Sequence, residues 1–206
     1  MVTERRKVGF FSAESGVALT EALIVMPIMV LAVAVCVEFT HVMYQWNSAA
    51  KAMQLGARRL IVSDPVTTDF FAIFDPYFSD TTAASGLLIP ADSSVQSTCS
   101  GAANDCVAGR LDWLVNGGGA GTTWPGLKAY YPSIETTDII VTYELSGLGY
   151  NGRPTGPVVT VRLDMAGAPI GLPFLGGFLG IAGFTFPPFT VTATSEDLCS
   201  LSGVGC

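Results

Sequence analysis

The stretch VALTEALIVMPIMVLAVAVCVEF, residues 17–39, decides the fold because it is apolar except for Thr20, Glu21 and Glu38. As an α-helix, these 23 residues would extend about 34 Å at about 1.5 Å per residue. That length is enough to cross a bilayer hydrocarbon core about 30 Å thick. We therefore predict a transmembrane helix over residues 17–39.

The residues before this stretch indicate its orientation. The cluster Arg5-Arg6-Lys7 is basic, and by the positive-inside rule it stays in the cytoplasm while the chain after Phe39 is exported. A secretory signal peptide is the alternative, but its apolar core is only about 7–15 residues long and small residues follow it. Here the apolar run is longer and the small residues, Ser12–Gly16, precede it. We therefore favour a retained anchor.

The apolar pattern continues beyond residue 39 as the stripe of an amphipathic helix, with apolar positions at spacings of three and four. We predict one continuous helix from Val17 to Val62, of which residues 40–62 are the amphipathic part. It ends before Asp64-Pro65, because the residue before a proline avoids helical geometry. The stripe consists of Val42, Met43, Trp46, Ala49, Ala50, Met53, Ala57 and Leu60.

Two acids interrupt the apolar stretch, and an ionisable group in a membrane segment is costly unless it has a partner. Glu38 lies at the far edge of the span, where we expect it to be solvated. Glu21 lies four residues after Val17, so a cut after Gly16 would place a new α-ammonium group within about one helical turn of its carboxylate. That ammonium group, on the same chain or on a neighbour in an assembly, is the predicted counter-ion. The alternative is that Glu21 reaches the lipid headgroups.

Three motifs occur in order along this segment: ESGVALTEALIVMP at 14–27, VEF at 37–39 and NSAAKAMQLGAR at 47–58. Together they resemble the TadE-like family, pilin-related proteins of the Tad (Flp) tight-adherence pilus machinery. The resemblance implies that a prepilin peptidase cuts after Gly16, so that residues 1–16 are a leader peptide and Glu21 is the fifth residue of the mature chain.

The same resemblance implies a single-pass helix in the bacterial inner membrane, in contact with its lipid, and a periplasmic remainder. It also implies a structural role as a minor pilin or pseudopilin, which assembles with other pilin-like subunits in pilus biogenesis and surface adhesion. The alternative from a different class is a membrane-anchored periplasmic binding or sensing module.

Residues 63–206 are expected to form the exported head. Aromatic residues are dense over 69–78, which predicts a short helix on the core, whereas 79–127 is rich in loop-forming residues. Three segments alternate apolar and polar residues as strands do: 138–145, 157–165 and 185–194. The predicted fold class is therefore α+β, with the long helix packed on a small antiparallel sheet with long loops.

Residues 166–188 carry no charge, but their four prolines and six glycines cannot hold a regular lipid-exposed second span. We predict instead an apolar crossover loop with a short helix at 172–181. Its Leu and Phe side chains make it the best candidate interface of the head, either for the membrane surface or for a partner.

The cysteines support export. Cys36 lies in the predicted span, and the other four form two equally spaced local pairs, Cys99 with Cys106 and Cys199 with Cys206. Four cysteines allow three connectivities, of which we favour the two local disulfides. Zinc bound by four thiolates is the rival, but zinc sites use closer ligand spacing and an oxidising compartment favours disulfides. We therefore predict no metal site.

Charge and motifs narrow the function further. Residues 1–62 hold 6 basic and 4 acidic residues, whereas residues 63–206 hold 4 basic and 13 acidic ones, so the head repels nucleic-acid phosphates. GLGYNG at 147–152 fits a dinucleotide-binding pattern, but Arg153-Pro154 follows where a helix is needed. With a single histidine, His41, and no plausible nucleophile–base pair, we predict a protein that is not an enzyme and needs no cofactor.

Overall fold

The computed structural model describes residues 14–78, 86–118, 124–151, 158–174, 176–177, 180 and 184–195. The chain divides into two compact units. Unit 1 comprises residues up to Val42 together with Leu172–Ala182, and unit 2 comprises Met43–Gly171 together with the residues from Gly183 on.

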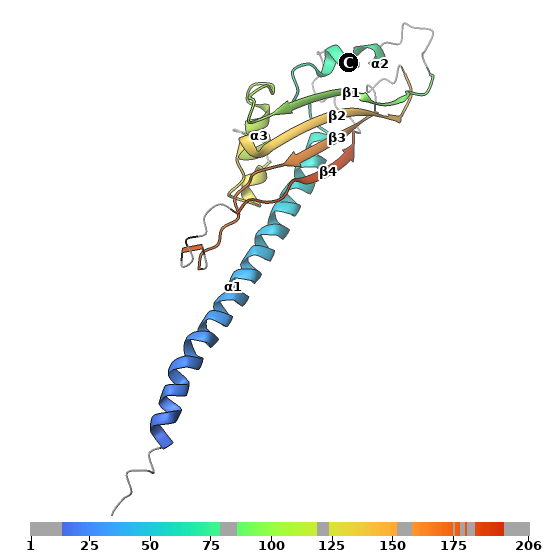
Figure 1. Cartoon of the computed structure of the whole chain (residues 1–206). Coiled ribbons are helices and arrows are strands. Elements are labelled where there is room, and N and C mark those ends of the chain that lie inside the picture. The colour runs from blue at the N-terminus through green and yellow to red at the C-terminus, as the bar shows by residue number, and fades with distance from the viewer. Residues whose placement is uncertain are drawn as a thin grey trace, which may run out of the picture. The chain divides into compact units, whose positions relative to one another are not determined.

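The first element is the helix α1, Glu14–Leu60, which is continuous along its 47 residues (Figure 1). The predicted single helix is therefore confirmed, although it begins three residues earlier and ends two residues earlier than expected. Its last turn is followed by the turn at residues 61 and 62, directly before Asp64-Pro65. Pro27 lies inside the helix without ending it.

The sheet in unit 2 has four antiparallel strands in the order β1-β2-β3-β4 (Figure 1). The strands are β1 (Ala91–Ser100), β2 (Ile139–Leu148), β3 (Val158–Met165) and β4 (Phe189–Thr194). The last three overlap the three predicted strands, although β2 ends three residues later and β4 begins four residues later than expected. The predicted α+β class with an antiparallel sheet is therefore confirmed. Within the described residues, two short helices and two 3-10 turns accompany the sheet: α2 (Phe70–Phe78), α3 (Arg110–Asn116), η1 (Leu127–Ala129) and η2 (Thr136–Asp138).

Residues 79–127, which the sequence predicts to be rich in loops, also contain β1 and α3, and neither of these elements was predicted. The sequence of β1, ADSSVQSTCS, has four serines, no aromatic residue and only two β-branched residues, Val95 and Thr98, so its preference for a strand is weak. It is nevertheless a strand because its backbone pairs with β2, where Ser97 lies opposite Tyr143 and Cys99 opposite Val141. Pairing with a strong neighbouring strand thus outweighs a weak local preference.

The core of unit 2 lies between α1 and the sheet. On β3, alternate residues are buried, as expected for a strand with one face on a core. Gly56 brings α1 close to this layer, since a Cβ added there would lie 2.8 Å from Leu127 Cδ2 and 3.0 Å from Leu163 Cδ2. The residues of α1 that are buried in the core are Ala49, Ala52, Met53, Ala57 and Leu60.

Polar contacts link the C-terminal part of α1, and residues 64–66 that follow it, to the rest of unit 2. The buried side chain of Gln45 makes two hydrogen bonds with Gly171, in which Gln45 Nε2 donates to Gly171 O and Gly171 N donates to Gln45 Oε1, both at 2.8 Å. The buried phenol oxygen of Tyr143 accepts a hydrogen bond from Val66 N at 3.2 Å. Arg110 forms an ion pair with Asp64 at 2.5 Å, directly beyond the helix end.

Candidate assembly segment

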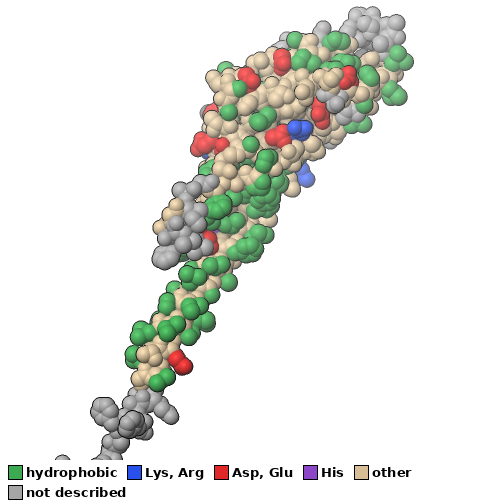
Figure 2. Space-filling view, viewed as in Figure 1, with side chains coloured by type: hydrophobic (Ala, Val, Ile, Leu, Met, Phe, Trp, Pro, Cys, Tyr) green, Lys and Arg blue, Asp and Glu red, His purple; other side chains and the backbone are tan. Residues whose placement is uncertain are grey.

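The N-terminal part of α1 exposes an unusual amount of apolar surface. Its large apolar side chains from Val17 to Val37 are between 43% and 69% exposed. Figure 2 shows hydrophobic side chains along this part of the helix. Exposed apolar area costs about 25 cal/mol per Å² in water, so this surface needs lipid or protein around it. Within the described residues, α1 is the one helix long and apolar enough to cross a membrane, and it fits a single-pass anchor.

The predicted processing site lies at the beginning of this helix. Gly16 has helical geometry and is exposed, and a Cβ added there would meet no atom within 4 Å. Val17 is 63% exposed. Residues 1–13 lie outside the described residues. Cleavage between Gly16 and Val17 stays a prediction.

Glu21 is exposed on the apolar part of α1. It lies four residues after Val17, and residues at that spacing are neighbours on one helix face. The carbonyl oxygen of Val17 accepts a hydrogen bond from Thr20 Oγ1 at 2.8 Å. Among the described residues, none forms an ion pair with Glu21. The role of Glu21 as an assembly residue stays a prediction.

The expectation that Glu38 is solvated is wrong. The side chain is 3% exposed, and its Oε2 atom accepts a hydrogen bond from Phe174 N at 3.1 Å. Within the described part of the chain, its Oε1 atom is buried and has no hydrogen-bond partner. The reason is a segment that is distant in the sequence. Leu172–Phe174 covers the carboxyl group, so water does not reach it although Glu38 lies at the edge of the predicted span.

The same segment forms an apolar groove with α1 in unit 1. The groove has a volume of about 610 Å³ and opens outward beside the exposed face of the helix. Its walls are Pro27, Val30, Leu31 and Ala34 from α1 and Pro173, Phe174 and Gly177 from the crossover segment. Of the short helix predicted at 172–181, helical geometry is described at residues 176–177, where Gly176 N donates to Leu172 O at 3.2 Å. The rest of that helix falls partly outside the described residues.

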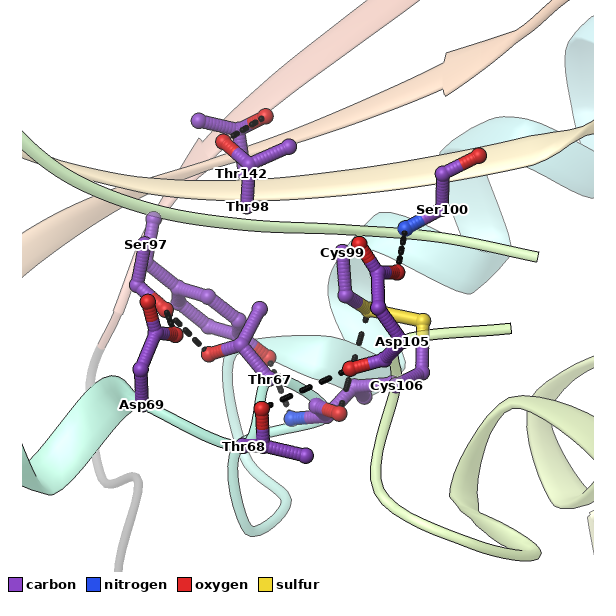
Figure 3. The surroundings of a disulfide bond; sticks show 12 residues. Thr67, Thr68, Asp69, Ser97, Thr98, Cys99, Ser100, Asp105, Cys106 and Thr142 are labelled. Carbon is purple, nitrogen blue, oxygen red and sulfur yellow. Dashed lines mark hydrogen bonds between the residues drawn. A yellow bond between two sulfur atoms is a disulfide. The ribbon is translucent and has the colours of Figure 1, made fainter. Parts of the chain in front are cut away.

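Cys99 and Cys106 form the predicted local disulfide, with their Cα atoms 5.0 Å apart (Figure 3). It closes the turn after β1, where Asp105 Oδ1 accepts a hydrogen bond from Ser100 N at 2.6 Å. The Asp105 carboxylate lies near both sulfur atoms, but two sulfurs joined to each other are not the thiolates that a metal ion prefers. Cys36 is free and exposed, and the predicted pair Cys199 and Cys206 lies outside the described residues.

Sequence reasoning missed the role of Glu38, although one signal was present. Glu38 and Gln45 are seven residues apart, so they lie on the same face of α1. Each is buried and each accepts a hydrogen bond from a backbone N–H of the crossover region, Glu38 in unit 1 and Gln45 in unit 2. Two polar residues at that spacing within an apolar stripe indicate a polar contact with another backbone segment.

Comparisons with known proteins test the predicted resemblance. The family model of the TadE-like protein matches residues 16–58. No curated protein and no solved structure matches the chain. The matched residues include Gly16, Glu21, Glu38 and Gly56, the positions on which the resemblance rests. Over residues 16–58 the chain is therefore similar to the TadE-like protein family, which is the family that the sequence resemblance indicated.

Proposed function

We propose that this chain is a minor pilin or pseudopilin of the Tad (Flp) pilus machinery and acts structurally rather than as an enzyme. The TadE-like match supports a role related to the Tad pilus. In this proposal the N-terminus is cytoplasmic, α1 crosses the inner membrane, and the residues after it are periplasmic. Its partners are a prepilin peptidase and other pilin-like subunits, with which it acts in pilus assembly and surface adhesion.

The observation that carries the proposal is the exposed acid on an exposed apolar helix. Placing an acid within a membrane helix costs up to about 2.5–3.5 kcal/mol at the helix centre, so Glu21 needs a compensating charge. A cut after Gly16 creates an ammonium group on Val17, four residues from Glu21. Opposite charges 4 Å apart attract by about 4 kcal/mol at an effective dielectric constant of 20, which is enough to offset that cost.

The two possible pairings of this ammonium group have different consequences. Pairing within one chain neutralises Glu21 but gives no reason for chains to associate. Pairing with a neighbouring subunit makes the compensation available only in the assembly, and it also fixes the axial register between the two helices. The apolar side chains around Glu21 would pack against the neighbour at the same time.

Replacing Glu21 with Gln tests this proposal, with the replacement of Glu38 by Gln as the matched control. Both substitutions remove one carboxylate from the same helix, but Glu38 already accepts a hydrogen bond within its own chain. We expect the Glu21→Gln chain to be processed but absent from the sheared pilus fraction or from complexes with pilin-like subunits, whereas the Glu38→Gln chain associates normally. A Glu21→Gln chain that assembles as well as the parent would refute the counter-ion mechanism.

A further inference from the structure

We propose that the crossover residues 172–174 and 176–177 are a second membrane-contacting element, which enters the bilayer beside α1 so that lipid acyl chains fill the groove between them. This inference rests on the assignment of α1 as a membrane anchor, and it assigns a function to a segment that lies far from the TadE-like match in the sequence.

The first observation is the position of the groove along α1, which sets its depth in the predicted membrane span. The residues of α1 that line the groove, from Pro27 to Ala34, lie four to eleven residues before Glu38. At about 1.5 Å per residue, the groove is about 6 to 16 Å from Glu38 along the helix axis, towards the middle of the predicted span. Because Pro173, Phe174 and Gly177 form the opposite wall, they lie at the depth of the hydrocarbon core and not only at its edge.

The second observation is composition. No charged residue occurs from 166 to 188, so entry of this segment into lipid carries no cost of burying a charge. Phe174 is 56% exposed, and the α1 residues Val30 and Leu31 beside it are 60% and 51% exposed. These side chains form a surface that is continuous with the apolar face of the anchor. The medium that covers the anchor therefore also reaches the groove.

The third observation is that two backbone donors of the segment have acceptors within unit 1, as a low-dielectric medium requires. Pro173 has no N–H group. Phe174 N donates to Glu38 Oε2, and Gly176 N donates to Leu172 O. Burying a carboxylate costs free energy. That cost is partly offset here because the carboxylate accepts a hydrogen bond from a backbone N–H that water cannot reach. Glu38 is thus a positioning residue that holds the crossover segment against α1.

A nitroxide label at residue 174 tests the proposal directly. The full chain with Cys36→Ala and Phe174→Cys is labelled and placed in vesicles of phosphatidylcholine and phosphatidylglycerol, and collision rates with oxygen and with a water-soluble nickel chelate are measured. The matched labels are Ile28→Cys on the anchor and Leu88→Cys on an exposed part of unit 2, which are 62% and 82% exposed in the parent chain. The Cys36→Ala parent, treated in the same way, supplies the background.

We expect the ratio of oxygen to nickel collisions at residue 174 to resemble that at residue 28 and to exceed that at residue 88 several-fold. A ratio at 174 that equals the ratio at 88, while 28 reports lipid, would refute the inference and leave the anchor intact. Protection of 174 from both reagents would also refute it, because the groove would then be covered by protein. A water-like ratio at residue 28 would refute the anchor itself.

The Glu38 contact gives a second, independent test. Glu38→Ala removes the acceptor for Phe174 N, whereas Glu38→Gln keeps an oxygen acceptor at the same position. We expect the alanine variant to lower the oxygen-to-nickel ratio at residue 174 and the glutamine variant to retain it, with no change at residue 28. Equal ratios in all three chains would show that Glu38 does not position this segment.

Discussion

Replacing Gly56 with Val should overpack the core of unit 2. The added Cβ would lie 2.8 Å from Leu127 Cδ2 and 3.0 Å from Leu163 Cδ2, whereas carbon atoms in contact prefer about 3.5–4.0 Å. Both leucines are 0% exposed, so neither side chain can move into solvent to make room. Overpacking of this kind costs about 1–3 kcal/mol, and the two further carbons of Val place the substitution at the upper end.

A gain in helix propensity partly offsets this cost of overpacking. Glycine is the poorest helix former after proline, so a substitution inside α1 recovers at most about 1 kcal/mol of helix propensity. We therefore expect the Gly56→Val chain to lose about 2 kcal/mol of unfolding free energy, the overpacking cost less the propensity gain. For a chain of this size, that loss lowers Tm by about 4–8 °C.

Tryptophan fluorescence of the full chain in detergent micelles is a suitable assay. All three tryptophans, Trp46, Trp113 and Trp124, pack against the core of unit 2, so their emission follows the unfolding of that unit in urea. Ala32→Val is the matched control, because it adds carbon atoms at an exposed position of the same helix. Unchanged unfolding midpoints in both variants would show that α1 does not approach the core as closely as described.

Three further predictions concern unit 2. Tyr143→Phe should cost about 1–3 kcal/mol in urea unfolding, because it leaves the buried N–H of Val66 without its acceptor; a smaller loss would indicate that another group satisfies Val66. Burial raises the pKa of the Tyr143 phenol, so the unfolded state ionises at about pH 10 while the folded state keeps its proton. The contribution of Tyr143 to stability should thus be constant below about pH 10 and fall by up to about 1.4 kcal/mol per unit as the pH rises further towards the raised pKa, and this slope should be smaller in the Tyr143→Phe chain. Replacing Cys99 and Cys106 together with Ser should cost about 2.5 kcal/mol for so short a loop, measured as a lower urea midpoint, and reduction of the parent should have the same effect.

Much of the architecture could be predicted because it depends on local patterns. An apolar run followed by a stripe at spacings of three and four specifies α1 without reference to any other segment. Alternation on β3, where Val159, Val161, Leu163 and Met165 are buried, likewise specifies a strand with one inward face. These patterns are reliable because every repeat places an apolar residue on the same face of the helix or strand.

The missed features depend on contacts between distant segments. Ser97 is fully buried in β1 although it is polar, because Ser97 Oγ hydrogen bonds to Thr67 Oγ1 and donates to Asp69 Oδ1, both at 2.5 Å. Likewise, Glu38 is buried by Phe174, 136 residues away in the sequence. A local pattern cannot show which backbone segment will cover a polar side chain, so such residues are assigned to the surface.

The mass of the mature N-terminus tests the central claim most directly. Membranes and surface appendages from cells that express the chain are analysed by mass spectrometry of the N-terminal peptide. We predict that the mature chain begins at Val17, so that the carboxylate of Glu21 lies four residues from a free amino group. A chain that still begins at Met1, or one that begins beyond the apolar stretch at residue 39, would contradict the account.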